Sequence, residues 1–192
     1  MSAVRLEREY FEDLYAADRD PWRFATSAYE RDKYARTVAA LEGRRFSRGL
    51  EVGCSIGVLT ERLAGICEEL IAVDVSERAV ATARERLAGH HAVEVDCRSL
   101  PEETPDGPFD LIVCSEVLYY FDADLLSRVI DELAARLEPG GSLLAVHWRP
   151  ETRTYPLQGD EVHEALRARP GFRLGFSEST EHYLLDRFDL NA

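Results

Sequence analysis

A turn with two glycines follows a short apolar run near residue 50. Residues 50–60 read Leu-Glu-Val-Gly-Cys-Ser-Ile-Gly-Val-Leu-Thr, so an apolar strand would end beside an acid and lead through the turn into a helix. Gly53 permits a tight turn, and Gly57 is expected to let the helix and the strand pack closely. The backbone of such a turn can approach a ligand that side chains would block. The pattern predicts a ligand-binding turn.

A second strand-like run ends in a carboxylate. Residues 70–76 read Leu-Ile-Ala-Val-Asp-Val-Ser, which places Asp74 17 residues after Gly57. In a nucleotide-binding α/β unit, an acid at this position accepts hydrogen bonds from both ribose hydroxyls. Ser76 is expected to cap the helix that follows. The alternative is an ordinary strand–helix turn with a surface aspartate.

Strands and helices that would position these residues alternate along the chain from residue 48 onward. Val80, Ala83 and Leu87 share one helical face, and a second apolar helical stripe covers 126–137. The strand-like runs between them are almost continuous Leu, Ile and Val, as expected of strands buried on both faces. The alternation favours a doubly wound, mostly parallel, Rossmann-like α/β sheet. The expected strands are 49–52, 70–73, 92–95, 109–114 and 142–147.

The two ends of the chain differ from this alternating part. A helix is expected over 158–168, followed by strands over 172–177 and 182–188 that form a hairpin and give the sheet a mixed edge. The first 46 residues are helical in tendency and rich in aromatics. Asp20-Pro21 is expected to divide them into two helices, because the residue before proline is pushed out of the α region.

Length and composition bound the function classes. The 192 residues predict a single domain, with a helical cap over 1–46 and an α/β core over 47–192. Asp and Glu number 36 against 23 Lys and Arg, and this net charge of −13 argues against nucleic-acid partners and anionic membranes. No apolar run approaches the roughly 20 residues that span a bilayer. Four cysteines without C-x-x-C pairing fit reduced thiols in a cytoplasmic protein, and the five histidines lack metal-ligand spacing.

These segments together resemble class I S-adenosylmethionine-dependent methyltransferases. The glycine turn and Asp74 are similar to the family's first two motifs, 95–97 to the end of its third strand, 109–120 to its fourth strand and following loop, and 137–144 to the turn into its fifth strand. The resemblance implies S-adenosylmethionine as cofactor and a seven-stranded sheet whose terminal strand is antiparallel. The cofactor contacts that it implies are Gly53, Cys54, Ser55, Gly57, Asp74, Val75, Asp96, Cys97 and Ser115, with Asp96 facing the adenine amine.

One residue of the glycine turn departs from the family pattern. Many members have glycine where this chain has Ser55. Either Ser55 avoids a positive φ, or the turn runs slightly differently, because a side chain disfavours the left-handed region.

A narrower resemblance lies near the front of the chain. Residues 20–34 read Asp-Pro-Trp-Arg-Phe-Ala-Thr-Ser-Ala-Tyr-Glu-Arg-Asp-Lys-Tyr, which is similar to the N-terminal signature of nodulation-type (NodS-like) methyltransferases. Those enzymes N-methylate the free amine of a de-N-acetylated chitooligosaccharide, so the resemblance implies an amino sugar or oligosaccharide as substrate. As a helical lid, the segment could bring Trp22 or a nearby tyrosine to the sulfonium and Arg31 to the cofactor carboxylate. Alternatively, its aromatics only fasten two helices to the sheet.

Candidates for binding the methyl acceptor lie near the ends of the fourth and fifth strands. Glu116 could bind an ammonium and receive its proton, and His147 is a second candidate for that role. Tyr119, Tyr120 and Trp148 could form the floor of a sugar site by stacking. The alternatives are a solvated glutamate, a structural histidine and aromatic rings that serve only in packing.

The sequence therefore predicts an enzyme that transfers a methyl group to a small polar acceptor. Within that prediction, the acceptor could also be another small molecule methylated on nitrogen or oxygen. An NAD-dependent oxidoreductase shares the α/β pattern, but the spacing of the glycine turn and the lack of a Tyr-x-x-x-Lys pair argue against it. A third hypothesis is a cofactor-binding module that interacts with a partner and catalyses nothing.

Overall fold

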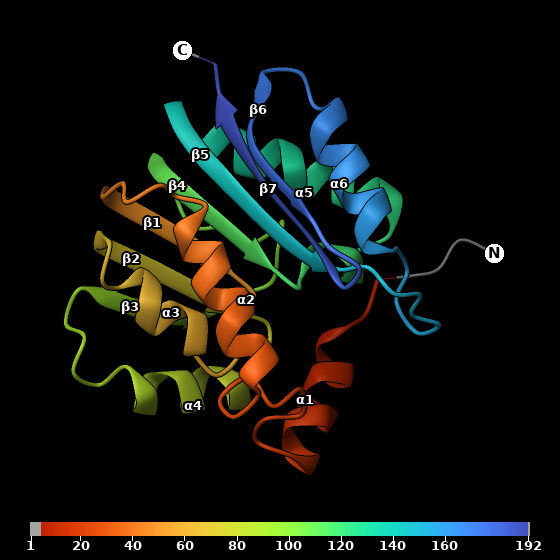
Figure 1. The fold of residues 1–192 in the computed structure, drawn as a ribbon. Helices are drawn as coiled ribbons and strands as arrows, with labels where there is room; N and C mark the ends of the chain where they lie inside the picture. The colour runs from red at the N-terminus through yellow and green to blue at the C-terminus, as the bar shows by residue number, and fades with distance from the viewer. Residues whose placement is uncertain (1–4, 192) are drawn as a thin grey trace. The chain divides into compact units, whose positions relative to one another are not determined.

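The structure is a computed structural model that describes residues 5–191. These residues form two compact units, one of residues 7–99 and one of residues 5–6 together with 100–191. In each unit helices lie beside a section of β-sheet (Figure 1).

The unit of residues 7–99 begins with two helices and continues as alternating strands and helices. β1 pairs in parallel with β2, and β2 pairs in parallel with β3, so the carboxyl ends of the three strands lie along one edge. The predicted strands are confirmed, although β1 and β2 begin three residues earlier than the predicted limits of 49 and 70. The elements are α1 (Arg8–Ala17), α2 (Ala28–Ala39), β1 (Phe46–Val52), α3 (Val58–Leu63), β2 (Cys67–Asp74), α4 (Glu77–Arg86) and β3 (Val93–Cys97).

Helix α4 packs on this part of the sheet through the apolar face that its sequence predicts. Val80, Ala83 and Leu87 form a buried cluster with Ala72 of β2 and Val95 of β3. Apolar side chains spaced three and four residues apart lie on one side of a helix, so they leave water together when that side meets the sheet. The hydroxyl oxygen of Ser76 accepts a hydrogen bond from the N–H of Ala79, which confirms the predicted helix cap.

The predicted break between the two N-terminal helices is confirmed. The Asp20 carboxylate accepts hydrogen bonds from the backbone N–H groups of Phe24, at 2.7 Å, and Ala25, at 2.9 Å. These bonds, together with Pro21, stabilise a non-helical turn because an aspartate side chain satisfies backbone donors that a helix would otherwise use. Ser27 then caps α2 by accepting from the N–H of Glu30.

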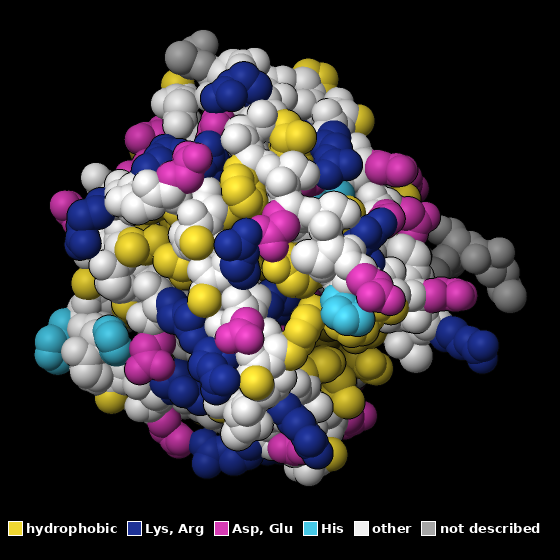
Figure 2. Space-filling model, viewed as in Figure 1, with side chains coloured by type: hydrophobic (Ala, Val, Ile, Leu, Met, Phe, Trp, Pro, Cys, Tyr) yellow, Lys and Arg dark blue, Asp and Glu magenta, His cyan; other side chains and the backbone are white. Residues whose placement is uncertain are grey.

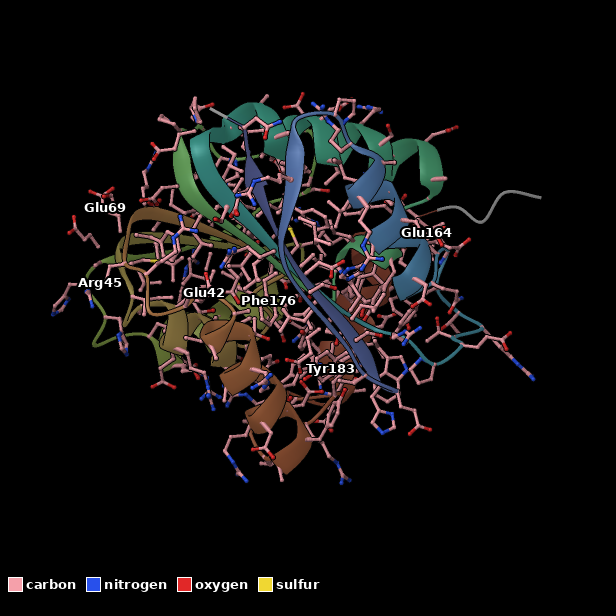
Figure 3. The ribbon with its side chains drawn as sticks, turned by 45° about the horizontal axis from the view of Figure 1, so that its top comes forward. Glu42, Arg45, Glu69, Glu164, Phe176 and Tyr183 are labelled. Carbon is pink, nitrogen blue, oxygen red and sulfur yellow. The ribbon has the colours of Figure 1, made fainter. Side chains whose placement is uncertain are left out.

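The second unit contains the parallel pair β4–β5 and a C-terminal hairpin. β7 is antiparallel to both β5 and β6, as the sequence predicts for the end of the chain. α6 contacts β5, β6 and β7, and the exposed Glu164 lies on α6 beside this hairpin in Figure 3. The elements are β4 (Phe109–Ser115), the short helix η1 (Leu118–Tyr120), α5 (Ala123–Arg136), β5 (Leu137–Trp148), α6 (Gly159–Ala168), β6 (Phe172–Ser179) and β7 (Tyr183–Leu190).

Strand β5 begins earlier than the sequence predicts. Its first residue, Leu137, pairs with Phe109, and the regular register resumes only at Ser142 opposite Leu111. The residues between, which include Gly140 and Gly141, form a bulge within the strand rather than a separate turn before it. A bulge absorbs extra residues without ending the pairing of the two strands.

The seven strands have the order β3-β2-β1-β4-β5-β7-β6. β7 lies between β5 and β6 and is antiparallel to both. This arrangement confirms the predicted Rossmann-like, mostly parallel seven-stranded sheet with an antiparallel terminal strand. Within residues 5–191, no helix combines the length and the apolar character needed to cross a membrane.

Candidate active site

The glycine turn between β1 and α3 is fastened to the end of β2. The backbone N–H groups of Gly53 and Cys54 donate to the Val73 carbonyl at 2.8 and 3.0 Å. Gly53 has φ +75°, and Ser55 has φ +50° although it carries a side chain. The first alternative for Ser55, that it avoids a positive φ, is therefore wrong. A non-glycine residue in this region is strained, and such strain is found mostly where a local structure over-determines it.

The structure explains the need for glycine at position 57 differently from the sequence. Its φ is +79°, and a side chain there would meet Cβ of Ala83, in α4, and Cδ1 of Leu87, the residue that caps α4, both at 3.2 Å. The close approach is thus between the start of α3 and the helix α4, not between α3 and its preceding strand. The expectation named the wrong neighbour because the sequence around Gly57 carries no information about which later element covers it.

The carboxylate of Asp74 joins the glycine turn to the turn after β2. Its Oδ2 accepts from the backbone N–H of Ser55 at 2.9 Å, and its Oδ1 accepts from the N–H of Ser76 at 3.0 Å. Burial raises the pKa of Asp74, although these hydrogen bonds act to lower it. Each carboxylate oxygen can accept a second hydrogen bond, so the side chain can also receive donors from a ligand.

Helix α1 contacts this turn through a tyrosine that the sequence did not single out. Tyr15, which is buried, is hydrogen-bonded through its hydroxyl to the Ser55 hydroxyl at 2.5 Å. Burial and the negative charge of Asp74 raise the pKa of Tyr15, so its hydroxyl stays protonated. The Glu12 carboxylate accepts from the N–H of Glu77 at 2.5 Å, which joins α1 to the start of α4. The only sequence signal that Tyr15 and Glu12 contact the same part of the protein was their spacing, because residues one helical turn apart lie on the same side of a helix.

Trp22 and Arg31, the two residues predicted on the helical lid, have different surroundings. The Trp22 ring is half-buried, stacks on Phe24 with centroids 5.6 Å apart and meets Tyr15 edge-on at 5.7 Å. Arg31 lies on an exposed side of α2. The same helix carries a buried ion pair instead, in which Lys33 Nζ lies 2.9 Å from Glu30 Oε2.

The end of β3 places Cys97, rather than Asp96, opposite Asp74. Asp74 pairs with Cys97 in the strand register, and the Cys97 thiol donates to the Val75 carbonyl at 3.4 Å. The Asp96 carboxylate is bound by Arg98, with Nη2 to Oδ2 at 2.9 Å, and lies 3.6 Å from Arg84 Nη2. Because burial raises the pKa of Cys97 to about 11 and that of Cys54 well above its ordinary value, both thiols stay protonated. These cysteines lack the thiolate that nucleophilic catalysis requires.

Glu51, the acid before Gly53, is a buried carboxyl group with a strongly raised pKa. It is 1% exposed, and burial raises its pKa to about 8, with the charge of Asp74 acting in the same direction. The side chain is therefore protonated at neutral pH. It lies inside the protein rather than at its surface.

In the unit that contains residues 100–191, Glu116 follows the buried end of β4 at Ser115. Glu116 has φ +54°, another non-glycine residue in the left-handed region. Its Oε2 accepts from the Tyr119 hydroxyl at 2.5 Å and from the backbone N–H of Trp148 at 2.8 Å. Burial, together with the charge of Glu116, raises the pKa of Tyr119, so Tyr119 remains the donor. The carboxylate is therefore held in one orientation by groups from η1 and β5.

The three aromatic residues predicted for substrate stacking belong to one cluster but are not equally exposed. Tyr119 is 4% exposed and stacks on Tyr155 with centroids 4.9 Å apart, so its ring serves in packing. Tyr120, which is half-buried, meets both of these rings edge-on, with centroids 4.8 Å apart in each case. Trp148 is half-buried and stacks on His182 with centroids 5.6 Å apart. Tyr155 was missed because it lies outside every predicted strand and helix.

The structure does not place His147 where a substrate could reach it. Its side chain is wholly buried, with Nε2 bonded to the N–H of Leu118 at 3.2 Å and Nδ1 bonded to His163 Nε2 at 3.1 Å. The expectation of a proton acceptor at this position is therefore corrected. Strand position correctly put His147 near Glu116, but only the tertiary fold shows that the ring points into the protein.

Among residues 5–191, no group of three or more His, Cys, Asp or Glu could hold a metal ion. On the face drawn in Figure 2, basic side chains are interspersed with acidic ones, and no uniform basic surface covers it.

Comparison with known proteins places the chain in a family of known methyltransferases. The family model for nodulation protein S (NodS) matches residues 7–152. Nodulation protein S of Bradyrhizobium diazoefficiens is 39% identical over 143 residues, which are 72% of this chain and 65% of that protein. The same protein of Sinorhizobium fredii is 32% identical over 130 residues, which are 67% of this chain and 60% of that protein. The chain thus spans less than two thirds of the length of these curated relatives.

A solved structure extends the likeness to the fold. The crystal structure of N-methyltransferase NodS from Bradyrhizobium japonicum WM9, in complex with S-adenosyl-L-homocysteine, is 28% identical and superposes with a TM-score of 0.86. The match covers 96% of this chain and 98% of that one.

Proposed function

Because the chain belongs to the nodulation protein S family of S-adenosylmethionine-dependent methyltransferases, we propose that it transfers the methyl group of S-adenosylmethionine to the amine of an amino sugar or oligosaccharide. The observation that carries the proposal is the Asp74 carboxylate hydrogen-bonded to the turn at Ser55. It sets an acid beside the glycine turn, and an acid in this place can accept hydrogen bonds from the ribose hydroxyls of an adenosyl cofactor.

The residues around this turn fit the cofactor. Asp74 would accept hydrogen bonds from the ribose hydroxyls while it keeps its bonds to Ser55 and Ser76. The remaining cofactor contacts in the proposal are Gly53, Cys54, Ser55, Gly57, Val75, Asp96, Cys97, Ser115, Trp22 and Arg31. Asp96 is the proposed contact that the structure supports least, because the adenine amine would compete with Arg98 for the Asp96 carboxylate.

Tyr15 belongs with these residues. Its protonated hydroxyl holds Ser55, and its ring adjoins Trp22, so α1 can cover the turn when a cofactor is bound. The bound cofactor supplies an electrophilic methyl group on a sulfonium, so the protein has only to orient the acceptor, exclude water and accept a proton.

Glu116 is the proposed proton acceptor. An amine acceptor must present its lone pair, so a fixed carboxylate nearby would bind the ammonium form and receive its proton. The two hydrogen bonds from Tyr119 and Trp148 hold Glu116 Oε2 in place. The half-buried rings of Tyr120 and Trp148 are the proposed stacking surfaces for a sugar.

A transfer assay with methyl-labelled S-adenosylmethionine tests the proposal. A chitooligosaccharide with one free amine is expected to accept label, and the same oligosaccharide with every amine N-acetylated is the matched control. Glucosamine, simple amines and phenols test the alternative of another small N- or O-acceptor. Label transfer to the phenols alone would overturn the amine assignment. NADH oxidation with no methyl transfer would favour the oxidoreductase instead.

The proposal also includes a cytoplasmic location for the enzyme. All four cysteines are thiols rather than disulfides, which fits a reducing compartment.

A further inference from the structure

A chain of polar side chains crosses the interior of the unit that contains residues 100–191. His147 of β5 contacts His163 of α6, and His163 Nδ1 contacts Asp186 Oδ2 of β7 at 2.8 Å. All three side chains are 0% exposed. Arg167 of α6, whose side chain is 40% exposed, reaches Asp186 Oδ2 at 2.6 Å from the outer side. The chain therefore begins at a surface arginine and ends at His147.

The hydrogen-bond partners fix the direction of this chain. The backbone N–H of Leu118 can only donate, so His147 Nε2 must accept and its proton must lie on Nδ1. That Nδ1–H then donates to His163 Nε2, which places the His163 proton on Nδ1 as well. The Nδ1–H of His163 donates to the Asp186 carboxylate. With Asp186 ionised, only one arrangement of protons satisfies these three hydrogen bonds.

Helix α6 is built to make this contact possible. A side chain at Gly159, the first residue of α6, would lie 2.3 Å from the Trp148 carbonyl oxygen and 3.2 Å from His147 Cβ. The helix therefore begins directly against the end of β5. His163 lies four residues later on the same helical face, which brings its ring to His147.

Asp186 supplies the fixed charge at the far end. Burial acts to raise the pKa of Asp186, but the hydrogen bonds from His163 and Ser177 and the attraction to Arg167 act against it, and the pKa is lowered. An ionised Asp186 accepts from His163 and cannot donate to it, so it permits only the proton arrangement described above. The acids on α6 itself are Asp160, Glu161 and Glu164, and the Asp160 carboxylate is paired with Arg149.

We propose that His147 and His163 are positioning residues: the chain from Asp186 holds the acceptor nitrogen of His147 toward Leu118 N–H and so fixes the turn that presents Glu116. That turn contains the strained backbone of Glu116 and the Tyr119 hydroxyl bonded to its carboxylate. A buried polar chain costs desolvation that an apolar core would avoid, and the orientation that it imposes is the role that we assign to it. The link to methyl transfer rests on the function proposed above.

Two variants at one position separate this role from simple packing. His163→Gln can keep an acceptor near the position of Nε2 for His147, whereas His163→Leu removes it. Ser142→Ala is the matched control, because Ser142 is also buried on β5 and bonded to β7, at Asp189 2.7 Å away, but pairs with Leu111 near the start of β4 and not with the end of β4 that leads into the turn. Thermal unfolding of the three variants gives the temperature at which each begins to unfold. The other measurements are made below the lowest of these temperatures.

The first readouts do not depend on activity. Nitrogen-15 NMR of the wild-type histidines is expected to show both rings protonated at Nδ1. In His163→Leu, Leu118 N–H is expected to exchange with solvent at least tenfold faster, and in His163→Gln and Ser142→Ala at nearly the wild-type rate. Protonation of His147 at Nε2 in the wild type, or equal exchange in the Leu and Gln variants, would overturn the proposal.

The kinetic readout joins the network to the reaction. His163→Leu is expected to lower kcat for methyl transfer about tenfold with KM for the cofactor within about twofold, and His163→Gln is expected to restore most of kcat. If His163→Leu, His163→Gln and Ser142→Ala all have the same kcat, the positioning role is also overturned. If no acceptor is methylated by the wild type, the function proposed above fails, while the NMR and exchange results still decide the inference.

Discussion

Asp74 Oδ2 and the backbone nitrogen of Ser55 are hydrogen-bonded at 2.9 Å, so the carboxylate that ends β2 holds the turn that follows β1. The two residues are 19 apart in sequence and meet because β1 and β2 run parallel and in register up to Val52 and Val73. The bond supports the backbone of Ser55 in a conformation that a residue with a side chain rarely adopts.

Asp74→Ala is expected to abolish stabilisation by S-adenosylhomocysteine. A ligand that binds only the folded state at 100 times its Kd adds about 2.7 kcal/mol, which raises Tm by several degrees in the wild type. Calorimetry or thermal-shift measurements with and without the compound check this. Asp32→Asn, at an exposed carboxylate on α2, is the control and should keep the full shift. A shift retained in Asp74→Ala, or one produced by NADH instead, would contradict the assignment of Asp74.

Tyr15 and Ser55 are expected to act together on cofactor affinity. Tyr15→Phe removes the hydroxyl that is bonded to Ser55 and should weaken binding of S-adenosylhomocysteine about three- to tenfold, as expected for one hydrogen bond. Ser55→Ala should have a similar effect, and the double variant should be no weaker than either single one. Isothermal titration of all four proteins measures this cycle, and additive losses would show that the two hydroxyls act separately.

Glu51 should make stability depend on pH. Its pKa is about 8 in the folded protein, against about 4.3 for an exposed glutamate, so the folded state binds a proton that the unfolded state releases. Its stabilising contribution is full below about pH 4.3 and is lost as pH rises toward 8, by up to about 1.4 kcal/mol per unit. Urea unfolding from pH 5 to 8 should show a steeper fall for the wild type than for Glu51→Gln. Equal slopes would mean that Glu51 ionises normally.

Gly57→Ala should cost more than Gly43→Ala. Both glycines have a positive φ, +79° and +71°, and an added side chain is strained at either, by about 1–2 kcal/mol. Only Gly57 lies against α4, and overpacking there should add about 1–3 kcal/mol. The difference in the free energy of unfolding therefore measures the packing of α3 on α4. Equal losses would show that backbone strain alone explains both glycines.

Glu116→Gln should reduce methyl transfer without affecting the cofactor. The amide keeps an oxygen that can accept from Tyr119 and Trp148 but cannot take the proton of an ammonium, so kcat should fall about 10²-fold. Affinity for S-adenosylhomocysteine should stay within about twofold. Tyr119→Phe, which removes only one bond to the carboxylate, should have a smaller effect. A Glu116→Gln enzyme with unchanged kcat would exclude Glu116 as the proton acceptor.

The sequence alone was sufficient to predict the order of strands and helices, the two turns at Gly53 and Asp74, the break at Asp20-Pro21 and the antiparallel end of the sheet. These features are local: apolar runs, glycine and proline positions and an acid after a strand are written in consecutive residues. The family resemblance rested on the same local motifs.

Only the tertiary structure decided which residues meet. It turned His147 inward to His163 and Asp186, set Tyr15 on Ser55 and placed α4 rather than a strand against Gly57. Each of these contacts joins residues that are 16 or more apart in sequence. No local pattern encodes such a contact, because the direction of a side chain is set by the element that packs over it. The one sequence sign of the buried chain was Asp186, an acid that directly follows two leucines in the strand Tyr183–Leu190.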